Sequence, residues 1–176
     1  MKLAELMQGH TPDPSYEGFS TADDFVLAVD FTGKAANPDD YVVAQEGISE
    51  HSAALNPQTQ ETQYVRGGAQ TNKTGNQRAF KLSGDRYIGD EFQDALMSHA
   101  IKYGKGPDVV KPYVYFNLLT GVGEQGDLCI QVEDDPAGAA GENAGISATL
   151  SARGVPAEYT YAPAVAPTAK SAPVQK

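Results

Sequence analysis

The sequence predicts a mainly β fold: two packed antiparallel sheets, as a sandwich or barrel, flanked by one α-helix. Most apolar stretches alternate with polar residues at the two-residue period of a strand. Only one convincing stretch, at about residues 90–103, has helical spacing. Turn residues separate the strands, and a long polar segment predicts a projecting hairpin. Because one helix cannot cover a whole sheet, we expect much of the sheet surface to contact another copy of the chain.

Composition limits the classes of function. A length of 176 residues indicates one domain, and 13 Lys and Arg against 23 Asp and Glu give a formal charge of −10. That charge opposes binding to phosphates, so nucleic acid is not expected as a tightly bound ligand. The single cysteine excludes an internal disulfide bond. The sequence has neither a signal-peptide pattern nor an apolar run long enough for a membrane span, so we expect a soluble protein made in the cytoplasm.

The N-terminal part is expected to lead into the domain. Residues 1–23 read as an arm with a short possible helix at 2–7, and the folded domain is placed at residues 24–161. The first strand, at 24–31, should be half-buried, and a second should run from Tyr41 toward Ile48. The apolar face of the first strand consists of Phe25, Leu27, Val29 and Phe31.

Residues 49–76 are polar and contain several glycines, which indicates a long projecting hairpin. Residues 77–83 are expected to be its return strand, with Phe80 and Leu82 facing the same way. An alternative for the hairpin is a disordered surface loop.

The helix is expected to begin at Asp90, whose carboxylate can cap free N–H groups, and to end at Gly104. Gln93 lies where the second residue of a capping box would be. The face expected to pack on the sheet includes Phe92, Leu96, His99 and Tyr103.

The C-terminal part alternates again in four stretches. Residues 110–118 and 127–133 read as a hairpin, followed by strands at 146–153 and 155–161. In the first of these, Tyr113 and Tyr115 lie on the face opposite Val114 and Phe116. The Ala/Pro-rich segment 162–176 is predicted to be a flexible tail outside the fold.

No catalytic, cofactor-binding or metal-ligating residues are predicted. The glycine spacing of GVGEQG at 121–126 matches a dinucleotide fingerprint, but a strand follows where the fingerprint needs a helix. The three histidines lie in unrelated segments, and no serine or cysteine has a nucleophile-elbow context. Asp134 and Asp135 could contact a cation, yet one acidic pair supplies too few oxygens for calcium. We therefore expect neither enzymatic activity nor a cofactor.

The order of these segments resembles the tail tube (major tail) proteins of long-tailed, siphovirus-type bacteriophages. The resemblance rests on SAALNPQTQETQYVRGGAQTNKTGNQRAFKLSG, on GDEFQDAL with its helix, and on the closing SATLSARGVPAEYTY. It covers roughly residues 24–161. The same fold occurs in the tubes of contractile tails and of type VI secretion systems.

The resemblance implies a structural subunit of the virion tail. Six copies would form a ring, and stacked rings would form a tube through which DNA passes without specific binding and without any membrane contact. Other partners would be the tape measure, tail terminator and distal tail proteins. The hairpin between Asn56 and Gln77 would reach the neighbouring ring, and the candidate contact residues are Asn56, Tyr64, Val65, Arg66, Asn72 and Lys73.

Two other classes of function remain open from the sequence. A β-sandwich binding module or virion decoration protein could stack a ligand on exposed Tyr113 and Tyr115. An enzyme would need a convergent group of ionisable side chains, which the sequence does not reveal.

Overall fold

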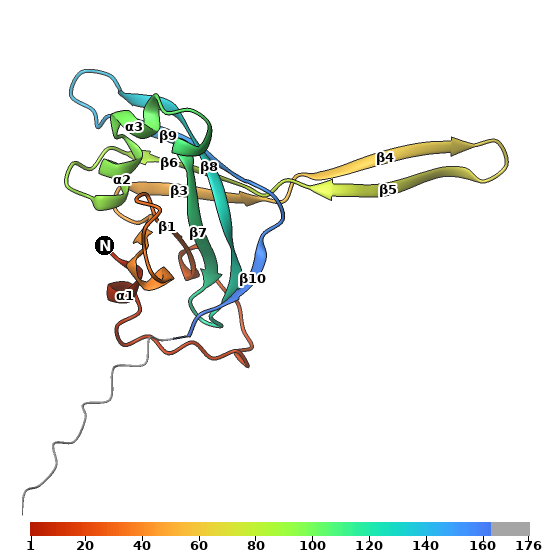
Figure 1. Cartoon of the computed structure of the whole chain (residues 1–176), viewed down its shortest axis with the longest axis horizontal. Coiled ribbons are helices and arrows are strands. Elements are labelled where there is room, and N and C mark those ends of the chain that lie inside the picture. The colour runs from red at the N-terminus through yellow and green to blue at the C-terminus, as the bar shows by residue number, and fades with distance from the viewer. Residues whose placement is uncertain (163–176) are drawn as a thin grey trace, which may run out of the picture.

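The computed structural model describes residues 1–162, which form one curved antiparallel sheet and a long two-stranded arm (Figure 1). The sheet has eight strands. Seven follow the order β2-β1-β7-β8-β9-β6-β3, and the eighth, β10, lies off this path and pairs with β8. The strands are β1 (Phe25–Val29), β2 (Val42–Val43), β3 (Ile48–Ala54), β6 (Ala79–Asp85), β7 (Val110–Asn117), β8 (Val122–Ala137), β9 (Gly145–Ala152) and β10 (Ala157–Thr160).

The mainly β prediction is confirmed, and the sheet curls into a half-barrel. The curl is visible in one contact: Phe80 on β6 lies edge-on to Tyr113 on β7, with ring centroids 5.5 Å apart. Two strands separate β6 from β7, so a flat sheet would hold these side chains about 14 Å apart. The flexible tail predicted at 162–176 lies, beyond residue 162, outside the described residues.

The main core fills the inside of the curl. Alternate residues of β1, β6, β7, β8 and β9 point into it, as the two-residue period predicts. Its buried strand residues are Leu27, Val29, Phe80, Leu82, Tyr113, Tyr115, Leu128, Ile130, Ala148 and Leu150.

A second apolar cluster covers the outer face of β1 and β7. The short helix α1 (Leu3–Leu6) brings Leu3 and Met7 onto this face, and Leu3 is fully buried there. The strand residues of this cluster are Val26, Ala28, Val43, Val114 and Phe116. The half-buried first strand was therefore a wrong prediction, because β1 is covered on both faces. Residues 1–7, expected as part of an arm, pack on the sheet.

The single helix predicted at 90–103 is two short helices, α2 (Glu91–Leu96) and α3 (His99–Lys102). Asp90 caps α2 by accepting a hydrogen bond from the backbone N–H of Gln93 at 2.9 Å. Ser98 then has the extended backbone of an N-cap residue (ψ 148°), so a new helix begins with a different phase. Three 3₁₀ turns complete the helical segments: η1 (Ala22–Asp24), η2 (Pro38–Asp40) and η3 (Gly106–Val109).

The break changes which residues pack on the sheet. Phe92 and Leu96 are buried against the core, and Ile101 is the buried residue of α3. His99 and Tyr103, predicted to lie on the packing face, are exposed and contact one another, with tilted rings whose centroids are 4.8 Å apart. No helix among residues 1–162 has both the length and the apolar character needed to cross a bilayer.

Candidate assembly surfaces

The arm consists of β4 (Pro57–Tyr64) and β5 (Gly68–Asn76), which pair only with each other. Their antiparallel ladder runs from Pro57 opposite Asn76 to Tyr64 opposite Gly68. Eight residues per strand give a length of about 27 Å. All but one of the strand residues are exposed, and the arm projects away from the body in Figure 1.

The arm continues a ribbon that begins inside the sheet. β3 pairs with β6 at its base, and β4 pairs with β5 beyond it, so residues 77–83 are not the return strand of the projecting part. The two ladders meet at an elbow where Asn56 has a positive φ of 40°. There the side-chain amide of Asn56 donates to the carbonyl of Gln77 at 3.2 Å.

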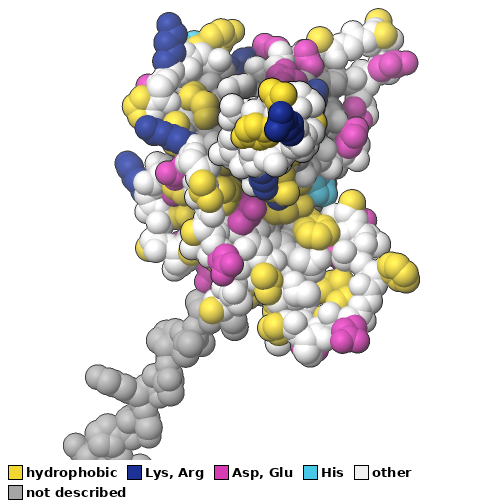
Figure 2. All heavy atoms as spheres, turned by 90° about the vertical axis from the view of Figure 1, so that its right-hand side faces the viewer, with side chains coloured by type: hydrophobic (Ala, Val, Ile, Leu, Met, Phe, Trp, Pro, Cys, Tyr) yellow, Lys and Arg dark blue, Asp and Glu magenta, His cyan; other side chains and the backbone are white. Residues whose placement is uncertain are grey.

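The predicted contact residues are distributed along the arm. Tyr64, Val65 and Arg66 gather at the tip, whereas Asn72 and Lys73 lie along the shaft and Asn56 lies at the elbow. Tyr64 is 50% exposed and Val65 is completely exposed. The predicted contacts at the tip thus include two apolar side chains that are exposed to solvent at the end of a polar arm. Figure 2 looks onto this tip, where hydrophobic and basic side chains lie together.

The arm and the rest of the chain differ in charge. Residues 57–76 contain Arg66 and Lys73 against Glu61, a formal charge of +1. Since the whole chain carries −10, the remaining residues carry −11. The projecting element is therefore cationic on a strongly acidic protein.

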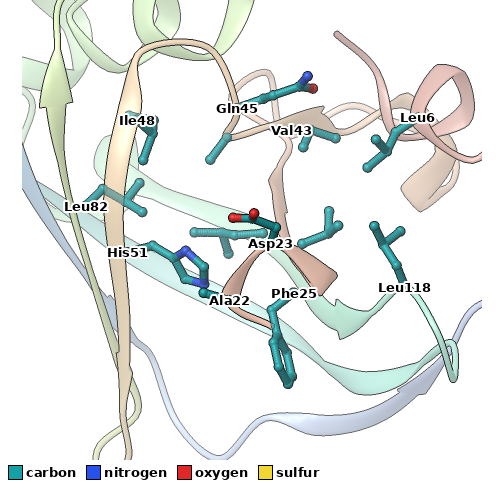
Figure 3. A pocket seen from close by; sticks show the side chains of 13 residues that line it. Leu6, Ala22, Asp23, Phe25, Val43, Gln45, Ile48, His51, Leu82 and Leu118 are labelled. Carbon is teal, nitrogen blue, oxygen red and sulfur yellow. The ribbon is translucent and has the colours of Figure 1, made fainter. Parts of the chain in front are cut away.

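The half-barrel is open between the two ends of its sheet. β2 is only two residues long, and no strand within residues 1–162 pairs with the outer edge of β3. Between these ends lies a pocket of about 300 Å³ (Figure 3). Its apolar walls include Phe25, Leu27, Val43, Ile48, Leu82 and Leu118.

Three polar side chains, Asp23, Gln45 and His51, also line this pocket. Asp23 and Gln45 are exposed, so they lie at the rim. The pocket was not predicted from the sequence, because its walls come from segments far apart in the chain.

Tyr113 and Tyr115 do not form a surface for ligand stacking. They are 1% and 9% exposed, because they point into the curl of the sheet and contact Phe80. Burial, with the nearby charge of Glu124, raises the pKa of the Tyr113 hydroxyl well above its ordinary value. The stacking platform that would define a binding module was therefore a wrong expectation for these two residues.

Both carboxylates of the acidic pair at 134–135 contact other side chains of the same chain. Asp134 accepts a hydrogen bond from the hydroxyl of Ser147, and Asp135 pairs with the Lys102 ammonium at 2.5 Å. No group of three or more His, Cys, Asp or Glu side chains in residues 1–162 is arranged to hold a metal ion. The glycines of GVGEQG lie in the β7–β8 turn and in β8 itself, so no helix N-terminus follows them.

The fold of this chain is similar to that of chains in solved structures. The chain is similar to one in the tail of an empty gene transfer agent particle with C6 symmetry, at a TM-score of 0.59 and 16% identity, covering 81% of this chain and 100% of that one. It is also similar to one in the virion of a native gene transfer agent particle, at a TM-score of 0.55 and 15% identity, covering 82% and 100%.

A third similar chain belongs to the sheath–tube complex of an extracellular contractile injection system, at a TM-score of 0.46 and 14% identity, covering 89% and 97%. No protein-family model matches the sequence, and no curated protein matches it. The likeness to the two gene transfer agent chains shows a fold that those tail and virion particles also contain.

Proposed function

We propose that this protein is a structural subunit of a virion tail tube, which assembles into stacked hexameric rings around a conduit for genome delivery. The observation that carries the proposal is the 27 Å arm, at about 3.4 Å per residue, which extends from the body and ends in exposed Tyr64 and Val65. A polar arm with an apolar tip has no evident role in an isolated subunit. It fits a subunit that must contact a neighbour.

The open half-barrel supports the same conclusion. The outer edge of β3 carries backbone N–H and C=O groups without partners among the described strands. Such edges favour pairing with another chain, and closed symmetry removes them. Contacts that do not close, such as those between stacked rings, generate a filament.

The proposed number of six copies in a ring is supported by the structural comparison. The gene transfer agent tail with a similar chain has C6 symmetry, and we transfer six copies to this protein as part of the proposal. In the tube, Tyr64, Val65 and Arg66 at the tip would contact the neighbouring ring, with Asn72 and Lys73 along the shaft and Asn56 at the elbow.

Charge is compatible with a conduit. A formal charge of −10 opposes tight phosphate binding, so DNA could pass without being held. In a tail, the tube would also meet a tape measure protein inside it, and terminator and distal tail proteins at its ends. None of these roles requires an active site.

Electron microscopy of the purified protein tests the proposal. We expect rods with a central channel and six-fold end views, whose number rises with protein concentration. A binding module or decoration protein would remain a small discrete species. Strictly monomeric protein at every concentration, salt and temperature tried would contradict the tube.

A further inference from the structure

We propose that the pocket between β1 and β3 binds the tip of the arm from a second copy of this chain. The inference rests on the proposed self-assembly and specifies the surface that receives the arm. It is carried by three observations on the described residues: the reach of the arm, the chemistry of the tip and pocket, and the difference in charge between them.

The tip cannot occupy the pocket of its own chain. The ladder of eight residue pairs holds Tyr64 and Val65 about 27 Å beyond the elbow. The pocket, in contrast, lies within the body, walled by β1, β3 and β6 (Figure 3). An arm that leads away from its own body in this way can reach this pocket only on another copy.

The chemistry of tip and pocket is complementary. The tip offers an aromatic and a branched aliphatic side chain, Tyr64 and Val65, next to the cation of Arg66. The pocket offers apolar walls such as Phe25, Leu82 and Leu118, with the carboxylate of Asp23 at its rim. A volume of about 300 Å³, at the lower end of the range for ligand pockets, has room for one or two such side chains.

Charge favours the same pairing. Arg66 and Lys73 are the only charged residues of the arm beyond Glu61, whereas the remainder of the chain carries −11. Association of a cationic tip with an acidic body is attractive between copies, and salt weakens this attraction. Tip-to-tip contact would instead bring like charges together.

The free edge of β3 adds a backbone contribution. Ile48 and His51 line the pocket from this edge, and the N–H and C=O groups on its outer side have no strand partner in residues 1–162. The turn at residues 65–67 carries backbone groups that could pair with them. Docking of the tip would thus cover both an apolar pocket and an exposed strand edge.

Disulfide trapping in the full chain tests the contact. The variant combines Val65→Cys at the tip with Gln45→Cys at the pocket rim, and Cys129→Ser removes the native thiol. A disulfide forms only where the two Cα atoms are about 4–7 Å apart. We expect oxidation of assembled protein to yield covalent species of two or more chains.

The matched control replaces Gln131 instead of Gln45. Gln131 is also an exposed glutamine, but it lies on β8 away from the pocket. Tubes that assemble but do not cross-link through Gln45→Cys, or that cross-link equally through Gln131→Cys, would overturn the docking contact and leave the tube intact. If the unaltered chain forms no assembly, the proposed function and this inference fail together.

A charge exchange gives an independent test. Arg66→Glu or Asp23→Arg alone should raise the concentration needed for assembly by about threefold or more, and the double exchange should restore it. Asp127→Arg, at an exposed acidic residue outside the pocket, controls for the change in net charge. Failure of the double exchange to restore assembly would contradict the inference.

Discussion

Arg78 and Glu124 join the base of the arm to the centre of the sheet. The Nε of Arg78 lies 2.6 Å from a carboxylate oxygen of Glu124, and the Tyr113 hydroxyl donates to the same oxygen at 3.2 Å. The Arg78 guanidinium also lies over the rings of Phe80 and Tyr115, at 4.6 and 5.0 Å. Arg78 immediately precedes β6, so this contact holds the elbow against the body.

Arg78→Ala should lower the free energy of unfolding by about 2–4 kcal/mol, because it leaves the Glu124 carboxylate poorly paired in a mostly buried site. Arg78→Lys should restore only part of the loss, since an ammonium keeps the charge but not the planar stacking on the two rings. Chemical denaturation at neutral pH measures both effects.

Lys81→Ala is the matched control for this ion pair. Lys81 lies on β6, three residues after Arg78, and pairs with Glu133 at 3.4 Å, but both side chains are well exposed. Its loss should cost less than about 1 kcal/mol. Equal costs for Arg78→Ala and Lys81→Ala would show that the buried network contributes no more than a surface pair.

Deletion of residues 63–72 should abolish tubes while leaving a folded subunit. The remaining arm residues can still pair, because Thr59 lies opposite Lys73 and residues 60–62 can form the new turn. The removed residues contribute almost nothing to either core, so stability should change by less than about 1 kcal/mol. Electron microscopy and thermal unfolding measure the two effects. Normal tubes from this variant would exclude the arm from assembly.

The sequence predicted most core strands because their alternation reflects burial on one face. Phe80 and Leu82, or Ile130 and Leu150, point into the curl as their spacing indicates. Where both faces of a strand are apolar, alternation does not show which of the two faces points into the core. In β7, tyrosines alternate with Val114 and Phe116, and the inner face proved to be that of the tyrosines.

The missed features have different physical causes. β5 has no apolar alternation because both its faces are exposed, so only its backbone ladder with β4 defines it. The helix break at Ser98 depends on the backbone of one residue, which spacing alone does not reveal. The pocket depends on how the curl brings Leu82 near Phe25. The contact residues of the arm remain predictions.

Gln93 should be a critical buried polar residue. Its side chain is 0% exposed; the amide donates to the carbonyls of Glu46 at 2.6 Å and Asp85 at 3.0 Å, and its oxygen accepts from the Tyr87 N–H at 2.8 Å. Gln93→Leu keeps the size but leaves these groups without partners, so we expect a loss of about 2–3 kcal/mol. Gln93→Glu cannot donate and should also destabilise at neutral pH. Denaturant midpoints compare the two variants.

Asp94→Asn is a control on the same helix. Asp94 is exposed, and an asparagine there can still accept hydrogen bonds from Arg86 and from the Gly89 N–H, so its replacement should cost less than about 1 kcal/mol. If Gln93→Leu is no more destabilising than Asp94→Asn, the hydrogen bonds from the Gln93 amide to the carbonyls of Glu46 and Asp85 do not stabilise the fold.

Tyr159 should make the protein less stable in alkali. Burial, with the nearby Asp39 charge, raises the pKa of its hydroxyl from 10.0 to about 12. Between these values the unfolded chain loses the Tyr159 proton while the folded chain keeps it, so the free energy of unfolding falls as pH rises. Below about pH 10 this contribution is complete, and above the folded pKa it is lost.

Tyr159→Phe removes this contribution to the pH dependence. Its stability relative to the unaltered chain should improve by about 1 kcal/mol between about pH 8 and about pH 11, because above about pH 10 only the unaltered chain must take up a proton at residue 159 when it folds. Tyr103→Phe, at an exposed residue just after α3, is the matched control. Urea unfolding at the two pH values measures the difference. Parallel curves for Tyr159→Phe and Tyr103→Phe would mean that packing against Phe116, at 5.6 Å between ring centroids, does not keep the Tyr159 hydroxyl protonated.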